Sequence, residues 1–159
     1  MTPRPIPRPR LETINPEELG APRGFSHGVL TPAGSRFLFV AGQVGWDREQ
    51  RIVAGGFAAQ FERALENIRT VLENAGGGVD QICRFTIYVT DKSVYLRELR
   101  PVGEAYRRVM GRHFPAMALV EVADLLEPGA QVEIEATAAL SPEPAEPAAT
   151  PKTPETNAQ

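Results

Sequence analysis

The sequence contains few of the side chains that bind metals or form disulfides. Its 159 residues include one cysteine, Cys83, and two histidines, His27 and His113. A lone cysteine cannot form an internal disulfide, and these three side chains lack the close spacing of a zinc-binding motif. We therefore expect no metal site. A protein without disulfides fits a reducing compartment, so a cytoplasmic location is the prediction.

The chain also lacks an excess of positive charge and any long apolar run. Its 17 basic and 20 acidic residues give a formal net charge of -3. A nucleic-acid-binding domain normally has a basic surface, so we expect no nucleic-acid partner. No apolar run approaches the roughly 18 residues of a membrane helix. The N-terminus has no apolar core of a secretory signal, and we expect no membrane partner.

Large apolar residues are scarce at both ends of the chain. Residues 1–10 alternate proline and arginine, and residues 141–159 carry five prolines among alanine, threonine and glutamate. Such a tail cannot bury enough apolar surface to offset the entropy lost on ordering. We predict a flexible arm over residues 1–10, one folded domain over 11–140 and a disordered tail over 141–159.

Hydrophobic periodicity within residues 11–140 predicts alternating strands and helices. Residues 57–75 carry apolar side chains at three- and four-residue steps and end at three glycines, which indicates a helix. A second helix is predicted over 101–111, after a short turn over 93–100. Strands are predicted over 36–41, 82–89, 118–122 and 132–140, with an extra one near 25–30. This order predicts an α+β fold with two helices packed on one face of a mixed β-sheet.

The strand after Pro115 alternates between two sets of side chains. We assign its small and β-branched set, Ala118, Val120 and Val122, to the face beneath the helices. Met117 and Leu119 then fall on the uncovered face. That face contacts either water or another subunit, and its apolar members favour an oligomer with closed symmetry. The full set predicted for it is Met117, Leu119, Glu121, Arg84, Tyr88 and Glu133.

Several motifs resemble one known family in order and spacing, over nearly all of residues 24–140. The most informative is Phe-Pro-Ala-Met-Ala-Leu-Val-Glu-Val at 114–122, followed by Val-Glu-Ile-Glu-Ala at 132–136. Together they resemble the RidA/YjgF family, the reactive-intermediate deaminases. Further motifs of the same kind are Gly-Phe-Ser-His at 24–27, Phe-Val-Ala-Gly-Gln at 39–43, Ala-Leu-Glu-Asn-Ile at 64–68 and Phe-Thr-Ile-Tyr-Val at 85–89.

The resemblance implies a chorismate-mutase-like α+β fold that assembles as a homotrimeric barrel with three clefts between subunits. Deaminating members hydrolyse enamines and imines, such as 2-aminoacrylate, to 2-oxo acids and ammonia. They need no metal and no cofactor. In those members the residue after Pro-Ala is an arginine that binds the substrate carboxylate, and a glutamate near the end of the domain helps to position water.

This sequence departs from that pattern at the residues that would line the cleft. Met117 stands in place of the arginine, and a thioether cannot form the paired charge-assisted hydrogen bonds of a guanidinium. Activity on 2-aminoacrylate is therefore doubtful unless another arginine restores it. Arg84 is one candidate, although an ion pair with Glu121 or Glu133 is the preferred interpretation. The other departures are Phe25 for tyrosine, His27 for glutamine, Ala41 for serine and Leu119 for a frequent cysteine.

The residues predicted for the site follow from these matches. Glu133 is the candidate catalytic group, with an interface carboxylate as the equally weighted alternative. His27 could contact a ligand, but a loop histidine bound to backbone is favoured, and Cys83 is expected in the core. The predicted substrate-binding residues are Phe25, His27, Gly42, Trp46, Met117 and Leu119.

These replacements make the predicted cleft more apolar than that of an arginine-bearing member. We predict a RidA-like protein that binds a small molecule at its subunit interfaces. It would hydrolyse an imine or enamine C–N bond in a less acidic substrate. The alternative is a non-catalytic protein that binds a hydrophobic ligand or a protein partner through the same clefts. A third hypothesis is a scaffold that recruits a partner through its proline-rich tail.

Overall fold

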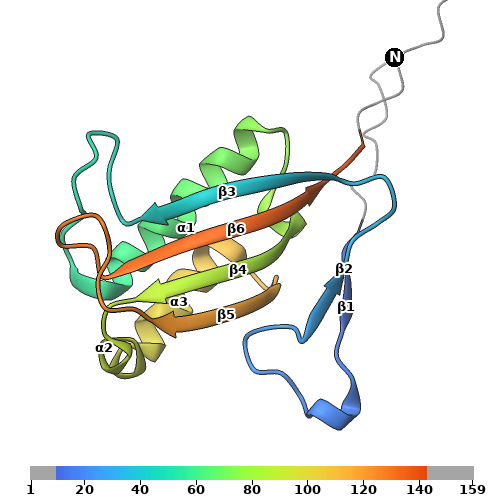
Figure 1. Cartoon of the computed structure of the whole chain (residues 1–159), viewed down its shortest axis with the longest axis horizontal. Coiled ribbons are helices and arrows are strands. Elements are labelled where there is room, and N and C mark those ends of the chain that lie inside the picture. The colour runs from blue at the N-terminus through green and yellow to red at the C-terminus, as the bar shows by residue number, and fades with distance from the viewer. Residues whose placement is uncertain (1–9, 143–159) are drawn as a thin grey trace, which may run out of the picture.

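A four-stranded mixed sheet forms the centre of the fold (Figure 1). The computed structural model describes residues 10–142, so the predicted arm and tail lie outside the described residues apart from Arg10, Ser141 and Pro142. The strand order is β3-β6-β4-β5, in which β4 and β5 are parallel and the other neighbours are antiparallel. The strands are β3 (Arg36–Val44), β4 (Ile82–Val89), β5 (Ala116–Glu121) and β6 (Val132–Leu140).

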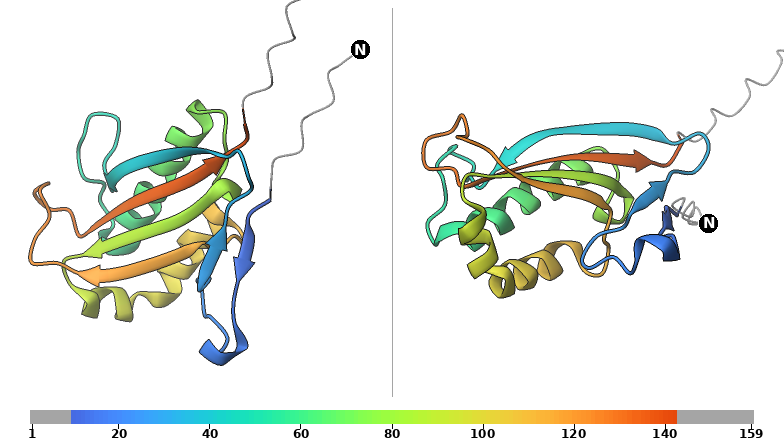
Figure 2. Two further views of the ribbon diagram at one scale, coloured as in Figure 1. Left: turned by 45° about the vertical axis from the view of Figure 1, so that its right-hand side comes forward. Right: turned by 60° about the horizontal axis from the view of Figure 1, so that its bottom comes forward.

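Three helices lie on one side of this sheet (Figure 2). They are α1 (Gly56–Asn74), the short α2 (Lys92–Arg97) and α3 (Leu99–Met110). The apolar stripe of α1 packs on the sheet because its side chains recur once per helical turn. Gly76, at φ 77°, continues the chain past the end of α1 in a conformation that favours glycine. The fully buried side chains of α1 and the sheet include Phe57, Leu65, Ile68, Leu72, Phe85 and Ile134.

A bidentate ion pair joins α1 to α3. Arg108 donates from Nε to Oε1 of Glu62 at 2.6 Å and from its second terminal nitrogen to Oε2 at 2.7 Å. The hydrogen bond from Arg108 holds the pKa of Glu62 below its ordinary value. A planar fork of this kind fixes the relative position of two helices more closely than a single contact does.

A two-stranded ribbon precedes the sheet. It consists of β1 (Glu12–Ile14) and β2 (Gly28–Leu30), which pair antiparallel. The chain leading into β2 is tied to the start of β5, because Ser26 donates its backbone N–H to Pro115 O at 3.1 Å and its hydroxyl to Phe114 O at 2.6 Å. These bonds hold residues 23–25 above the edge of the sheet.

Most predicted elements are confirmed, some with shifted ends. The strands over 82–89 and 132–140 have the predicted bounds, and α1 differs from its prediction by one residue at each end. β5 begins two residues earlier than predicted, and β3 continues three residues further, past an irregularity in its pairing with β6 between Val40 and Gln43. α2 overlaps the predicted turn over 93–100 and is a third helix beside the two that were predicted, and α3 begins two residues before its predicted start. β1 was not predicted, because its three exposed residues show no hydrophobic alternation.

The face assigned to Met117, Leu119 and Glu121 was wrong. In the parallel register of β4 and β5, Met117 pairs with Phe85 and Leu119 with Ile87, and both partners are buried beneath the helices. Met117 and Leu119 also pack against this core, whereas Ala118 and Val120 are exposed. The prediction chose the covered face by side-chain size and assigned the smaller residues to it. β5 is an edge strand beside a cavity, so its covered face accommodates larger residues than a tightly packed centre would.

The opposite face of the sheet is uncovered in the single chain. Arg84, Tyr88 and Glu133 lie on it as predicted. Arg84 and Tyr88 share the face of β4 opposite to the buried Phe85 and Ile87, and Tyr88 pairs in register with Glu133. The strand β3 adds two large apolar side chains, since Phe37 is 55% exposed and Phe39 is 78% exposed. Among residues 10–142, no helix has the length and apolar character needed to cross a membrane.

Candidate functional site

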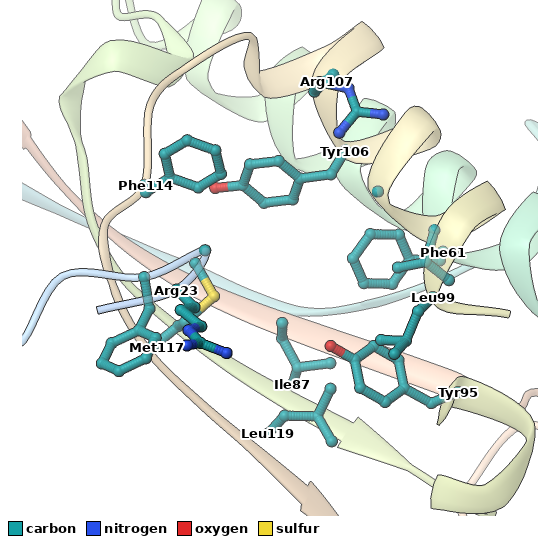
Figure 3. A pocket seen from close by; sticks show the side chains of 14 residues that line it. Arg23, Phe61, Ile87, Tyr95, Leu99, Tyr106, Arg107, Phe114, Met117 and Leu119 are labelled. Carbon is teal, nitrogen blue, oxygen red and sulfur yellow. The ribbon is translucent and has the colours of Figure 1, made fainter. Parts of the chain in front are cut away.

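A pocket of about 450 Å³ opens between the β4–β5 edge of the sheet, the helices α2 and α3 and the loop that precedes β2 (Figure 3). Three of the predicted ligand-binding residues, Phe25, Met117 and Leu119, line it. Its volume falls in the range of about 300–1,000 Å³ that is common for small-molecule sites. The other lining residues are Arg23, Gly24, Phe61, Ile87, Tyr95, Leu99, Val102, Gly103, Tyr106, Arg107 and Phe114.

An aromatic pair forms one wall of this pocket. The rings of Tyr106 and Phe114 stack with centroids 5.4 Å apart and planes inclined by 4°. The Tyr106 hydroxyl donates to His113 O at 2.6 Å, and burial raises the pKa of this phenol. Tyr106 therefore stays protonated, and its hydroxyl is engaged with the backbone. We interpret it as a rigid wall rather than as an acid or a base.

The pocket holds two positive charges and no negative one among its described lining residues. Arg23 reaches it from the loop and Arg107 from α3, where its Nη1 lies 3.6 Å from the position that a Cβ would occupy at Gly103. Figure 3 shows the Arg23 guanidinium beside Met117 and the Tyr95 hydroxyl pointing into the pocket, and both arginines are exposed. Sequence reasoning missed all three residues; the available signal was the position of Arg23 two residues before Phe25.

The predicted catalytic residue lies elsewhere. Glu133 is on the uncovered face of the sheet, and its carboxylate lies so close to Gly42 that a Cβ at that position would collide with it. The absence of a side chain at Gly42 therefore leaves room for the Glu133 carboxylate in this position. Neither residue lines the pocket that contains Met117. Within one chain, the predicted site residues thus divide into two groups on opposite faces of the sheet.

His27 is held by the loop around it. Its Nε2 is 3.1 Å from Gly20 O, and its backbone N–H donates to the Asn15 side chain at 2.9 Å. Its ring also meets Phe25 edge-on, with centroids 5.2 Å apart. The favoured interpretation of a histidine bound to backbone is confirmed. His27 lines a smaller cavity of about 250 Å³ that also includes Met117.

Trp46 lies in the turn after β3. Its backbone pairs with Ile52, and its carbonyl accepts from Asn67 of α1 at 3.2 Å. The neighbouring Gly45 packs directly on the backbone of Gln60, which ties this turn to α1. Trp46 lines neither the pocket that contains Met117 nor the smaller cavity beside His27, so its predicted part in substrate binding stays a prediction.

Arg84 does not make its predicted ion pair. Over residues 10–142, the structure contains no bond between this guanidinium and Glu121 or Glu133. Glu121 instead accepts the backbone N–H of Lys92 at 2.8 Å, at the start of α2. Arg84 lines two smaller cavities on or beside the uncovered face. It is separated by the sheet from the apolar pocket and does not replace the missing arginine there.

Cys83 is a core residue, as predicted. It is 8% exposed, its thiol donates to Thr137 O at 3.1 Å, and burial raises the pKa of the thiol. A thiol kept protonated is a poor nucleophile. In the part of the chain that the structure describes, no three His, Cys, Asp or Glu side chains gather as a metal ion would require.

Comparisons with known proteins agree with this fold and with the position of the motifs. The family described as Endoribonuclease L-PSP matches residues 16–140. The RutC family protein UK114 of Drosophila melanogaster is 34% identical over 134 residues, which are 84% of this chain and 90% of that protein. A 2-iminobutanoate/2-iminopropanoate deaminase of Homo sapiens is 32% identical over 124 residues, or 77% of this chain and 85% of the human protein.

Solved structures show the same fold. The Rid family protein YyfB from Yersinia pestis superimposes with a TM-score of 0.73 at 32% sequence identity, covering 82% of this chain and 99% of that one. Family match, sequence identity and fold therefore agree over nearly the whole described region. The chain belongs to the RidA/YjgF family, some members of which are imine deaminases.

Proposed function

We propose that this protein hydrolyses the C–N double bond of an imine, or of the imine tautomer of an enamine, that is larger and more apolar than 2-aminoacrylate. The observation that carries the proposal is the pocket between β5 and the helices, in which Met117, Leu119, Phe25 and the Tyr106–Phe114 pair form a mostly apolar lining. The human relative is named for the deamination of 2-iminobutanoate and 2-iminopropanoate, which supports the reaction class.

Assembly is part of this proposal. Glu133 and Gly42 lie on the uncovered face, near the β3 side of the sheet, whereas the pocket lies beneath the β5 edge. A single chain cannot bring these groups to one ligand. A homotrimer that buries the uncovered face would cover Phe37 and Phe39 and could bring the β3 edge of one subunit to the β5 edge of its neighbour. The ligand would then bind in a cleft between subunits.

The chemistry requires only water and a proton carrier. Water adds to the electrophilic carbon of the imine, the resulting carbinolamine loses ammonia, and a carbonyl product remains. In the proposed assembly, the Gly42 backbone orients the substrate, while Glu133 accepts a proton from the attacking water and returns it to the leaving nitrogen. The close approach of the Glu133 carboxylate to Gly42 supports pairing these two roles.

The test is an ammonia-release assay on imines generated in solution, with side groups ranging from methyl to aromatic. We expect turnover that rises with the size of the apolar group and falls by about 10²-fold or more in Glu133→Gln. Glu135→Gln, which changes a carboxylate on the same face of β6, is the matched control. Turnover no greater than that of Glu133→Gln across the whole series would rule out the proposal.

A non-catalytic binding protein is the second candidate. It is favoured by the absence of any acid, base or nucleophile other than the arginines and tyrosines among the described residues that line the pocket. A ligand specific to the folded state raises the apparent stability of a protein. Ligand-induced thermal shifts without release of ammonia from any imine would therefore favour binding over catalysis.

A further inference from the structure

The guanidinium groups of Arg23 and Arg107 have no counterion in the pocket. Among residues 10–142, neither forms an ion pair or a side-chain hydrogen bond, and no aspartate or glutamate lines the same cavity. Most other arginines with a described partner are bound to a carboxylate nearby, as Arg108 is to Glu62. The two pocket arginines are thus available to a ligand.

A mostly apolar pocket changes what such a charge contributes. Its floor and walls are Ile87, Leu119, Phe61 and the Tyr106–Phe114 stack, and these side chains keep water away from one side of any bound molecule. Attraction between opposite charges strengthens as the effective dielectric constant falls. A ligand with an apolar body and one anionic group would bind to both parts of this lining, whereas a neutral hydrocarbon would gain nothing from the exposed cations.

Arg23 has the better position of the two. Figure 3 shows its guanidinium beside Met117, across from the inward-pointing hydroxyl of Tyr95, and Arg23 is exposed at the mouth of the pocket. Its segment is fixed because Ser26, three residues later, is bonded to Phe114 O and Pro115 O on the chain that leads into β5. Arg107 lies along α3, further toward the opposite side. An anionic group between Met117 and Tyr95 would therefore meet Arg23 first.

We infer that Arg23 is the anion-binding residue of this pocket and that its ligand is a carboxylate with an aromatic or branched aliphatic body. Arg23 donates to the carboxylate, the Tyr95 hydroxyl adds a second donor, and Arg107 contributes long-range attraction. The inference rests on the proposed function in naming the substrate class of the same pocket: an imino acid with a bulky side chain. It changes the expectation drawn from Met117 alone, since the charge is supplied from another segment of the chain.

The test measures binding alone, by isothermal titration calorimetry of the full-length protein with three probes. They are 3-phenylpropionate, its neutral amide 3-phenylpropionamide and the small carboxylate propionate. We expect 3-phenylpropionate to bind at least about tenfold more tightly than either of the others, because only it has both the anion and the apolar body. Arg23→Gln should weaken its binding by about 10- to 100-fold, the range expected for loss of a charge-assisted hydrogen-bond pair.

Three variants separate this role from a structural one. Arg23→Lys keeps the charge and should retain part of the affinity, Arg107→Gln should have a smaller effect than Arg23→Gln, and Arg112→Gln, at an exposed arginine outside the pocket, should have none. Equal binding of the acid and the amide, or unchanged binding in a folded Arg23→Gln, would overturn the inference. So would the absence of any 3-phenylpropionate binding.

These results are independent of the turnover assay. Binding that depends on Arg23 without ammonia release would keep this inference and remove the proposed catalysis. Turnover of neutral imines that is unchanged by Arg23→Gln would keep the proposed catalysis and remove this inference.

Discussion

Met117 and Glu133 lie on opposite faces of the same four-stranded sheet. Met117 pairs with the buried Phe85 on the helix-covered face, whereas Glu133 pairs with Tyr88 on the uncovered one. The sheet itself therefore separates the residue at the arginine position from the candidate proton carrier. Any reaction that uses both needs two copies of the chain.

Substitution of Met117 by arginine tests whether the pocket accepts small acidic imines. We expect Met117→Arg to raise ammonia release from 2-aminoacrylate by about tenfold or more, because a guanidinium on the pocket floor gives its carboxylate two charge-assisted hydrogen bonds. Leu96→Arg is the control, since Leu96 is 57% exposed on α2 and does not line the pocket. No gain would indicate that Phe25 and its neighbours have reshaped the site.

The uncovered face should carry the contacts of the proposed homotrimer. Phe39 is 78% exposed, and burying a phenylalanine side chain contributes roughly 1.5–3 kcal/mol. We expect the parent protein to have a trimeric mass in size-exclusion chromatography with light scattering, and Phe39→Glu to shift it to a monomer. Leu126→Glu, at a loop residue that is 92% exposed, should remain a trimer. A monomeric parent protein would contradict the proposed assembly.

Two glycines of the β3 region should differ in their tolerance of a methyl group. A Cβ at Gly45 would collide with the Cα and the carbonyl oxygen of Gln60 in α1, and neither of these backbone atoms can move alone. A Cβ at Gly42 would meet only the end of the Glu133 side chain, which can rotate away. We expect Gly45→Ala to lower the free energy of unfolding by about 1–3 kcal/mol.

Gly42→Ala should instead leave the free energy of unfolding nearly unchanged and reduce turnover, because the displaced Glu133 carboxylate no longer lies beside the backbone at residue 42. Urea unfolding followed by circular dichroism measures the first effect for both variants, and the ammonia assay measures the second. Equal destabilisation by the two alanines would show that the Glu133 side chain is as rigid as the backbone of α1.

The Glu62–Arg108 pair predicts a pH dependence of stability. Because the hydrogen bond from Arg108 lowers the pKa of Glu62, the folded state binds this proton more weakly than the unfolded state does. The stabilisation is therefore present above the ordinary glutamate pKa of about 4.3 and is lost as pH falls through the lowered value. The melting temperature of Glu62→Gln should be lower than that of the parent protein at pH 7, and the difference between the two should shrink below about pH 4.

Glu73→Gln provides the comparison for this prediction. Its carboxylate lies 3.8 Å from Arg69 on the same helix and does not join two elements. We expect a smaller change in melting temperature at every pH, since exposed pairs within a helix contribute little. A Glu62→Gln difference that persists unchanged into acid would show that the side chain stabilises the fold through packing and not through its charge.

Local pattern was sufficient for most of the secondary structure. The stripe of Phe57, Phe61, Leu65 and Leu72 predicted α1, and the alternation of Phe85, Ile87 and Val89 predicted β4, because each buried face repeats with the period of its own element. The short β1 had no such repeat, since its residues pair only with β2 and remain exposed. β1 is a strand only because it pairs with β2, which is equally short and begins 14 positions after the end of β1.

The amino-acid sequence by itself determined the family, the order of the elements, the alternation within each strand and the replacement of an arginine by Met117. Only the tertiary structure decided which alternating set of β5 faces the helices, because the register against β4 and not side-chain size sets that face. It also brought Arg23 beside Met117 across 94 positions of chain. No local pattern encodes such a contact, since it arises only when the loop before β2 is bonded to the start of β5.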